Sequence, residues 1–363
     1  MKLMHTKDNA SKTVLLVISS LLPGGAERVT LGLAEYLKNE GWDPHLFVAC
    51  DIKNHAGLYI VPNGIPVYKS SFGSGNKILR PILNCIHLRH VMKKINPVWV
   101  ISLGAQYKVL SLAGCFNNSK VLLSERNYPL AFYKKNMLRK VEKYYSRATK
   151  VVFQTKSELE CYKEFDSTKA IIIPNSVKQN LPQWSGQSSK RVAFVGRLMD
   201  QKNPMLALKA FSIFIRSHED WALDFYGDGP LKELLICKAR SLNITDKVVF
   251  HGNVSDVVAK VATSGMYIST SNYEGISNSM LEALAMGVPS VCTDCAGGGA
   301  RIAIKNGKNG FLVKCDDALA FAKCMDQIAK FPSLAKELSF EAVESAKKFE
   351  PSRIYSMWLK AIS

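Results

Sequence analysis

The amino-acid sequence predicts an α/β protein with two Rossmann-like domains, whose parallel sheets face each other across a cleft. Its 363 residues suffice for about two domains, each with its own core. Short apolar runs alternate with segments of helical periodicity along nearly the whole chain, which is typical of parallel sheets covered by helices on both faces. A polar, aperiodic stretch at residues 178–190 interrupts the alternation, and the cycle of strand, glycine-rich turn and helix then begins again.

The first half opens with the apolar run KTVLLVIS at residues 12–19, which predicts a buried strand. A glycine-rich turn and an amphipathic helix at 26–40 follow it. Apolar residues recur at helical spacing from 76 to 95, just before Pro97, so a second helix is predicted there. A third helix is predicted at about 132–147. The other strands of this half are predicted at 45–50, 98–103, 120–124, 150–154 and 170–173.

The second half repeats this organisation. Its strands are predicted at residues 191–196, 222–226, 247–251, 265–269, 290–293 and 311–313. The predicted parts of the chain are a first domain at 1–177, a linker at 178–190, a second domain at 191–350, and a C-terminal helix at 351–363 that packs back on the first domain. Because such sheets hold ligands at the carboxyl ends of their strands, we expect the functional site in the cleft between the domains.

Composition excludes several classes of protein. A hydrophobic fraction of 47% excludes an intrinsically disordered chain. The sequence has no run of about 18 apolar residues and residues 1–9 lack the apolar core of a secretory signal, so we expect neither a membrane span nor export from the cytoplasm. Nine scattered cysteines fit reduced thiols better than disulfides. The one close pair, Cys292 and Cys295, lacks the further ligands of a zinc site.

The chain is strongly basic, and the excess lies in its first half. The formal net charge is +18, and residues 1–180 carry 26 Lys and Arg against 12 Asp and Glu. A basic surface can bind nucleic acid, an anionic membrane or a phosphorylated ligand. The sign of the charge alone does not choose between these three partners.

A glycine pair follows the first predicted strand. Gly24 and Gly25, in LPGGAER at residues 22–28, let the backbone approach a ligand without a Cβ, and the helix behind them presents an N-terminus that favours an anion. A tight turn between strand and helix explains the same residues equally well. The spacing is not G-x-G-x-x-G, which argues against a dinucleotide-binding dehydrogenase.

Two cations follow the first strand of the second half, in VGRLMDQKN at residues 195–203. Asn203 and Pro204 are typical of a helix N-cap and first turn, so Lys202 should lie just before a helix and Arg197 at the strand end. A planar guanidinium and a compact ammonium that converge there would bind a diphosphate and stabilise it as a leaving group. The alternative is a pair of solvated surface charges.

The most informative stretch is YEGISNSMLEALAMGVP at residues 273–289. A short apolar helix that carries Glu282 is predicted here. It follows the cap-type residues Ser277 and Asn278 and ends at Gly287. A capping box of Ser279 with Glu282 would explain the second glutamate, but it leaves Glu274 in the preceding loop unexplained. Carboxylates at these positions can accept hydrogen bonds from sugar or ribose hydroxyls, and the loop amides can hold a phosphate.

Taken in order, these motifs resemble those of the family 4 retaining glycosyltransferases of GT-B architecture, in particular bacterial members that assemble O-antigen, capsule and N-glycans. The resemblance covers essentially the whole chain, and its most specific part is the spacing of Glu274 and Glu282, which matches the family's E-x7-E signature. The motifs that carry it are GGAER (24–28), IIPNSV (172–177), VGRLMDQKN (195–203), YGDGPL (226–231), FHGNV (250–254) and EGISNSMLEALAMGVP (274–289).

The resemblance implies that the second half binds a nucleotide-sugar donor, with a UDP-sugar the expected one. Arg197 and Lys202 would hold the diphosphate, Glu282 would bind the ribose hydroxyls, and Glu274 would bind the sugar. The other donor-binding residues that it implies are Gly24, Gly25, Val254, Gly275, Ile276, Ser277 and Asn278, mainly through their backbones. No metal or other cofactor is implied, since the two cations replace it and the sequence has no Asp-x-Asp motif.

The resemblance also implies retention at the donor's anomeric carbon, by front-side attack in which the leaving phosphate helps to take the acceptor's proton. Many relatives have a histidine after the fourth strand of the first half, where this chain has LSERNYP at residues 123–129. We therefore expect Glu125 to act at the reaction centre in its place, with a buried ion pair as the alternative. Arg126 is expected to contact the acceptor.

The same resemblance suggests a function for the excess of Lys and Arg in the first half. Residues 133–150 combine an apolar face with seven cations and only one acid, Glu142. A basic amphipathic helix in this half suits an anionic membrane and a lipid-diphosphate acceptor, and a solvated basic face is the alternative. The residues expected to make these contacts are Lys134, Lys135, Arg139, Lys140 and Lys143.

We therefore expect a hexosyltransferase at the cytoplasmic face of the inner membrane, which transfers a hexose or N-acetylhexosamine to a saccharide on an undecaprenyl-diphosphate-type lipid. A nucleotide-sugar epimerase of the same architecture is one alternative, and the E-x7-E spacing argues against it. A nucleic-acid-binding protein is another, but the basic segments have neither interleaved aromatic residues nor a recognised binding motif.

Overall fold

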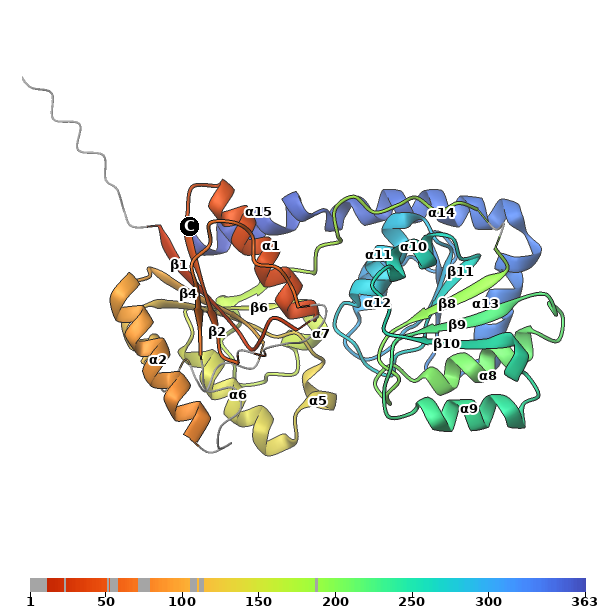
Figure 1. The fold of residues 1–363 in the computed structure, drawn as a ribbon, viewed down its shortest axis with the longest axis horizontal. Helices are drawn as coiled ribbons and strands as arrows, with labels where there is room; N and C mark the ends of the chain where they lie inside the picture. The colour runs from red at the N-terminus through yellow and green to blue at the C-terminus, as the bar shows by residue number, and fades with distance from the viewer. Residues whose placement is uncertain are drawn as a thin grey trace, which may run out of the picture.

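The structure is a computed structural model that describes residues 12–22, 24–50, 52, 58–70, 79–104, 110, 114–186 and 189–363. The chain forms two parallel sheets, each with helices on both faces (Figure 1). The predicted α/β class with two Rossmann-like domains is therefore confirmed.

The strands of the first sheet are β1 (Thr13–Ile18), β2 (Asp43–Val48), β3 (Val67–Lys69), β4 (Trp99–Leu103), β5 (Lys120–Ser124), β6 (Lys150–Phe153) and β7 (Ala170–Ile172). They are parallel, in the order β3-β2-β1-β4-β5-β6-β7. The apolar run of β1 lies next to the central strand β4, where both faces of the sheet are covered by helices. The sequence analysis missed β3, because three residues are too few to show a periodicity.

The helices that the structure describes in the first domain are α1 (Gly25–Asn39), α2 (Leu79–Ile95), α4 (Cys115–Asn118), α5 (Pro129–Phe132), α6 (Lys135–Arg147), α7 (Lys156–Leu159) and the 3-10 turn η1 (Ser167–Lys169). The single helix predicted at 132–147 is wrong at its start. Lys134 has an extended backbone and separates α5 from α6. The first residues of the helix predicted at 76–95, residues 76–78, lie outside the described residues.

The strands of the second sheet are β8 (Arg191–Val195), β9 (Ala222–Tyr226), β10 (Val248–Gly252), β11 (Met266–Ser269), β12 (Ser290–Thr293) and β13 (Phe311–Val313). They are parallel, in the order β10-β9-β8-β11-β12-β13. Each lies within one residue of its predicted position. The helices and 3-10 turns of this domain are α8 (Pro204–Phe214), α9 (Lys232–Ser241), η2 (Thr245–Lys247), α10 (Val257–Ala262), α11 (Asn278–Met286), α12 (Gly299–Ala303), α13 (Ala318–Lys330), α14 (Pro332–Ala346) and η3 (Lys347–Phe349).

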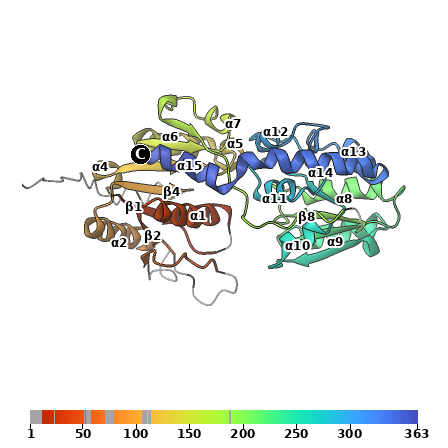
Figure 2. The ribbon, with the colours of Figure 1, turned by 90° about the horizontal axis from the view of Figure 1, so that it is seen from above.

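The last helix, α15 (Pro351–Ile362), leaves the second domain and lies beside α1 of the first domain (Figure 2). Its side chains Ile354 and Trp358 are fully buried in the core of the first domain. Between β7 and β8 the described residues form no helix or strand, and the indole of Trp184 donates a hydrogen bond to the carbonyl oxygen of Ser264 at 2.9 Å. Among the helices that the structure describes, none is long and apolar enough to cross a membrane.

Candidate active site

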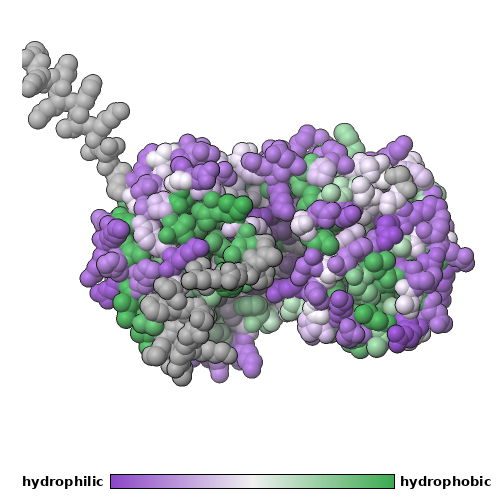
Figure 3. All heavy atoms as spheres, in the orientation of Figure 1, coloured by the Kyte–Doolittle hydropathy of each residue, from purple (hydrophilic) through white to green (hydrophobic). Residues whose placement is uncertain are grey.

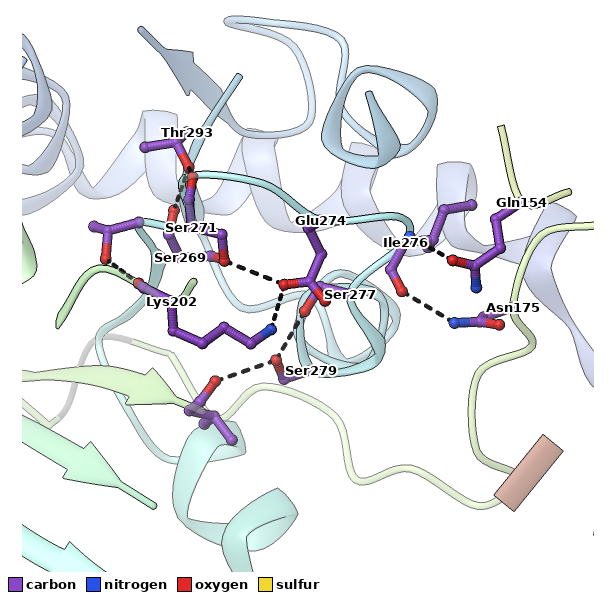
Figure 4. Close-up of polar contacts among 12 residues, drawn as sticks. Gln154, Asn175, Lys202, Ser269, Ser271, Glu274, Ile276, Ser277, Ser279 and Thr293 are labelled. Carbon is purple, nitrogen blue, oxygen red and sulfur yellow. Dashed lines mark hydrogen bonds and ion pairs between the residues drawn. The ribbon is translucent and has the colours of Figure 1, made fainter. Parts of the chain in front are cut away.

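The site residues predicted in the second domain gather at the carboxyl ends of β8 and β11, where this domain faces the first. The loop after β8 carries Arg197 and Lys202. The loop after β11 carries Glu274 and leads into α11, and Figure 4 shows the side chains of Lys202 and Glu274 turned toward each other. In the face shown in Figure 3, hydrophilic residues border the hollow between the two domains. The cleft predicted from the sheet topology is therefore present, with charged side chains at its wall.

Lys202 and Glu274 form an ion pair in this cleft. Nζ of Lys202 donates to Oε2 of Glu274 at 2.5 Å, and the hydroxyl of Ser271 donates to the same oxygen at 3.3 Å. The hydroxyl of Thr270 donates to the carbonyl oxygen of Lys202 at 3.1 Å, which ties the two loops together. Only 16% of the lysine and 20% of the glutamate side chain is exposed, so water screens this pair less than a surface ion pair.

Arg197 and Val254 occupy the same edge of the sheet. The side chain of Arg197 is exposed, and none of the described residues forms a hydrogen bond or ion pair with it. Val254 follows β10 and packs, half-buried, against the apolar cluster around α11. Asn203 and Pro204 begin α8 as N-cap and first residue, as predicted. The joint binding of one anion by Arg197 and Lys202 stays a prediction.

Helix α11 has the ends that the sequence predicts, but it has no capping box. Ser277 is its N-cap, and Gly287 is its C-cap in the left-handed conformation. Ser279 lies inside the helix, where its hydroxyl bonds to the hydroxyl of Tyr267 at 2.9 Å. The capping box of Ser279 with Glu282 is therefore wrong, because the helix begins two residues earlier than the box requires. Glu282 lies in the second turn, where it caps nothing.

Glu282 instead pairs with Arg28 of α1, on the other side of the cleft. Nη1 of Arg28 donates to Oε1 of Glu282, and Nη2 donates to the carbonyl oxygen of Ser176 at 3.0 Å. The side chains are 15% and 12% exposed. Arg28 belongs to the GGAER motif, in which only the two glycines were predicted to bind a ligand. No local pattern could have revealed this pair, since its members are 254 positions apart.

The first domain holds the backbone that follows Glu274, which corrects one prediction. The amide of Ile276 donates to Oε1 of Gln154 at 3.1 Å, and its carbonyl oxygen accepts from Nδ2 of Asn175 at 3.0 Å (Figure 4). The amide of Ile276 is therefore not available to a phosphate or sugar in this structure. A Cβ on Gly275 would overlap Oε1 of Gln154, so a residue without a side chain is needed for this close approach.

The predicted glycine pair lies against the second domain. Helix α1 begins at Gly25, where a Cβ would lie 2.7 Å from Nδ2 of Asn278, so the N-termini of α1 and α11 meet across the cleft. Both helix N-termini favour an anion between them. Next to Gly24, however, the carboxylate of Glu27 fills the space that a Cβ would take. A diphosphate placed on that side of Gly24 would meet this carboxylate.

Glu125 does not reach the cleft, which corrects its predicted role at the reaction centre. Only 1% of the surface of Glu125 is exposed. The amides of Arg126 and Asn127 donate to Oε1 at 2.8 and 3.1 Å, and the hydroxyls of Tyr145 and Tyr162 donate to Oε2 at 3.1 and 2.5 Å. Burial raises the pKa of this carboxyl. The alternative of a buried ion pair is wrong as well, because its donors are amides and hydroxyls.

Arg126 is also misplaced by the prediction. Its Nη1 donates to Oδ1 of Asn175 at 2.7 Å, and its guanidinium lies 5.3 Å from the ring centroid of Trp358 in α15. Burial lowers the pKa of Arg126 to about 10. The half-buried residue thus contacts Asn175 and the C-terminal helix, and its side chain is not turned outward with the cations of α6.

The other residues predicted to bind acceptor and membrane are exposed on or next to α6. Val141 and Tyr145 of this helix are buried in the first domain, so its polar face is turned to solvent. Leu130 and Phe132 of the neighbouring α5 are also exposed, and Figures 1 and 2 place α5 at the edge of the first domain nearest the second. The exposed cations are Lys134, Lys135, Arg139, Lys140 and Lys143.

A glycine-rich loop that the sequence analysis does not single out supports Glu274. The amide of Glu274 donates to the carbonyl oxygen of Ala296 at 2.9 Å. Gly297 has a φ of +99°, and a Cβ on it would overlap the carbonyl oxygen of Glu274. The signal was available in the sequence, because three glycines at 297–299 follow shortly after a predicted strand.

If Glu274 binds the donor sugar as predicted, Gly297→Ala is expected to lower kcat/KM by about tenfold or more, because it displaces the backbone that holds this carboxylate. Gly307→Ala is the matched control, since its φ of +76° imposes the same backbone cost while a Cβ there meets no atom within 4 Å. Gly307→Ala should lose about 1–2 kcal/mol of stability in thermal unfolding, and Gly297→Ala should lose more, because its Cβ also overlaps the backbone of Glu274. Equal activity of the two would contradict a supporting role for Gly297.

A small pocket opens behind Glu274. Burial raises the pKa of both thiols that line it, that of Cys295 to about 12, so they remain protonated at neutral pH. Over the described part of the chain, no group of three His, Cys, Asp or Glu residues is arranged to hold a metal ion. The pocket is lined by Ser269, Ser271, Glu274, Gly275, Ser277, Met280, Cys292, Thr293, Cys295 and Ala300.

Comparison with known proteins agrees with this architecture. Residues 181–346 match the family described as "Glycosyl transferases group 1". The chain is 26% identical to an uncharacterized glycosyltransferase of Haemophilus influenzae, over 92% of this chain and 95% of that protein. It is 28% identical to the Campylobacter jejuni enzyme named GalNAc-alpha-(1->4)-GalNAc-alpha-(1->3)-diNAcBac-PP-undecaprenol alpha-1,4-N-acetyl-D-galactosaminyltransferase, over 96% of this chain and 98% of that protein.

The fold is shared with solved glycosyltransferase structures. The structure of Anabaena HepE in complex with UDP-glucose matches with a TM-score of 0.81 at 16% identity, over 96% of this chain and 98% of that one. This likeness shows the common fold of two facing domains. Residues 181–346 are thus similar to the group 1 glycosyl transferases, the chain resembles glycosyltransferases over nearly its whole length, and its fold is the GT-B architecture.

Proposed function

We propose that this glycosyltransferase is a retaining hexosyltransferase of family 4, which moves a hexose or N-acetylhexosamine from a UDP-sugar to a saccharide linked to a lipid diphosphate. The observation that carries the proposal is the placement of Glu274 and Glu282 at one cleft, each paired with a cation. Carboxylates accept hydrogen bonds from sugar and ribose hydroxyls, and the neighbouring cations can bind a diphosphate.

Three features support a nucleoside diphosphate in this cleft. The N-termini of α1 and α11 meet there, which favours an anion. Lys202 brings a shielded ammonium, and Arg197 brings a guanidinium that the described residues leave unpaired. Such cations stabilise the charge that develops on a leaving diphosphate, so we expect the reaction to proceed without a metal ion.

Front-side attack fits the side chains of the site. Lys202 and Ser271 donate hydrogen bonds to the carboxylate of Glu274. These bonds stabilise its negative charge and so make it a weaker nucleophile for a covalent intermediate. In the proposed reaction, the bond between the anomeric carbon and the diphosphate oxygen breaks, and the acceptor oxygen bonds to that carbon on the same face. The leaving phosphate oxygen takes the acceptor's proton.

The proposed acceptor rests on a relative and on the charge of the first domain. The C. jejuni relative is named for a saccharide linked through PP to undecaprenol. The exposed cations of α6 give this protein a surface that attracts diphosphates and anionic lipid headgroups, and Leu130 and Phe132 add exposed apolar side chains beside it. We therefore place the enzyme peripherally on the cytoplasmic face of the inner membrane.

Transfer assays with purified protein test the proposed function. UDP-linked hexoses and N-acetylhexosamines are offered together with undecaprenyl-diphosphate-linked saccharides in the presence of EDTA, and GDP-sugars serve as controls. The expected product carries one added sugar with the donor's anomeric configuration. An inverted linkage would contradict retention, and activity lost in EDTA would contradict metal independence. An isomerised UDP-sugar formed without acceptor would identify an epimerase instead.

Membrane binding is expected to depend on α6. Replacing Lys134, Lys135, Arg139, Lys140 and Lys143 with glutamine should weaken sedimentation with vesicles that contain an anionic lipid by at least about tenfold, since each cation near such a surface adds about 1 kcal/mol. The control replaces five exposed cations of the second domain, namely Lys209, Arg216, Arg240, Lys323 and Lys336. If both variants lose vesicle binding equally, or if the protein binds neutral vesicles equally well, the basic face of α6 does not bind anionic lipid.

A further inference from the structure

Arg28 links three parts of the molecule through one side chain. It belongs to α1 of the first domain, it donates from Nη1 to Glu282 on α11 of the second domain, and it donates from Nη2 to the carbonyl oxygen of Ser176, which follows β7. A guanidinium is a rigid planar fork, so it can satisfy both partners only while these segments keep their present arrangement. The contact therefore exists only when the two domains are closed on each other.

Glu282 keeps one carboxylate oxygen free in this arrangement. Oε1 accepts the hydrogen bond from Arg28, and no described residue donates to Oε2. A carboxylate has about four lone-pair sites, so a second partner can bind while Arg28 stays in place. Arg28 can thus fix the direction of the carboxylate without competing for the ligand.

The pair is also shielded enough to matter energetically. Arg28 is 15% and Glu282 12% exposed, so the charges attract each other more strongly than at an open surface. The carboxylate nearest to Arg28 in sequence, Glu27, lies against Gly24 instead. The contact across the cleft is therefore a specific pairing.

We propose that Arg28 is a positioning residue for the nucleotide: by orienting Glu282 from the opposite domain, it makes tight binding of the ribose hydroxyls depend on domain closure. This inference rests on the proposed assignment of Glu282 to the donor ribose. It adds that the nucleotide site is completed by the first domain, whereas the second domain supplies the carboxylate itself.

The test is a double-mutant cycle on UDP binding, measured by calorimetry. Arg28→Gln and Glu282→Gln should each weaken UDP binding by about tenfold, and the double variant should be little weaker than either single one, because both changes break the same arrangement. Arg28→Lys keeps the charge but cannot hold two partners in a fixed fork, so it should fall between wild type and Arg28→Gln. The control is Lys38→Gln, which removes an exposed cation from the same helix. This variant should bind UDP like wild type.

Kinetics and unfolding separate positioning from a structural role. Arg28→Gln should raise KM for the UDP-sugar more than it lowers kcat, because it weakens binding of ground state and transition state alike. Additive losses in the double variant, or an unchanged KM with a lowered melting temperature, would overturn the inference even where Glu282→Gln alone confirms the donor site. Wild-type protein that does not bind UDP would overturn the donor assignment and this inference with it.

Discussion

Replacing Glu282 with alanine is expected to lower kcat/KM for the UDP-sugar by at least about a hundredfold, because the ribose hydroxyls and Arg28 both lose their acceptor in a partly buried site. The protein should stay folded. Glu282 lies in the second turn of α11, whose N-cap is Ser277, so the substitution removes no cap. Steady-state kinetics and thermal unfolding on the same preparation measure the two effects separately.

Glu337→Ala is the matched control for this substitution. Glu337 is an exposed glutamate on α14 of the same domain, and no described residue pairs with its side chain. Its kinetics should equal those of wild type. A Glu282→Ala variant with nearly full activity and a modest loss of stability would show that Glu282 has only a structural role, and the donor assignment would then be wrong.

Most of the fold could be predicted because buried parallel strands leave a local signal. Strands such as β1 and β8 are short apolar runs, covered by helices on both faces, and their limits differ from the predicted ones by about one residue. The prediction failed where the local signal was weak. β3 has too few residues for a period, and the apolar spacing around α6 continues across Tyr133 and Lys134, whose extended backbones nevertheless separate α5 from α6.

The site in the second domain could also be predicted in part. Lys202 and Glu274 lie in loops that follow two strands of one parallel sheet, and such loops meet at the same edge. The partners of these charges could not be predicted. Arg28 reaches Glu282 only because α1 and α11 meet across the cleft, and that arrangement depends on how two whole domains pack, which leaves no periodicity in either segment.

The predicted catalytic role of Glu125 is wrong because distant segments of the chain bind its carboxylate. A carboxylate just after a strand at the site edge has the position of a functional residue, and the sequence analysis interpreted it so. Its donors include Tyr145 and Tyr162, which lie 20 and 37 positions further along the chain. Whether a polar side chain is free for a substrate depends on which later segments supply its hydrogen bonds, and spacing around the residue itself does not show this.

The contacts between the domains at the site are polar. They comprise the ion pair of Arg28 with Glu282 and the hydrogen bonds of Gln154 and Asn175 to Ile276. Opening the cleft exchanges such bonds for bonds to water, so it costs far less than separating an apolar interface of equal area. We therefore expect a donor to enter by domain opening, and closure to restore the same contacts around it.

Replacing Lys202 with alanine is expected to lower kcat by about a hundred- to a thousandfold, the usual effect of removing one group that stabilises charge in a transition state. In the proposed reaction the leaving diphosphate gains negative charge as its bond to the sugar breaks, and Lys202, whose side chain is 16% exposed, is the cation proposed to stabilise it. KM should change less, since Arg197 still attracts the diphosphate. Single-turnover measurements at saturating UDP-sugar isolate this step. Lys209→Ala, an exposed lysine on α8, is the control.

The ion pair of Lys202 with Glu274 leads to a further prediction about UDP binding by the Lys202→Ala variant. Removing the lysine leaves the glutamate with only the hydroxyl of Ser271, so an unpaired carboxylate would face the incoming diphosphate. Part of the loss in Lys202→Ala should then come from repulsion, and Lys202→Ala combined with Glu274→Gln should bind UDP more tightly than Lys202→Ala alone. The kcat of the double variant should stay low, because the stabilising cation is still missing. A kcat for Lys202→Ala within about threefold of wild type would contradict the assignment of this residue to the leaving group.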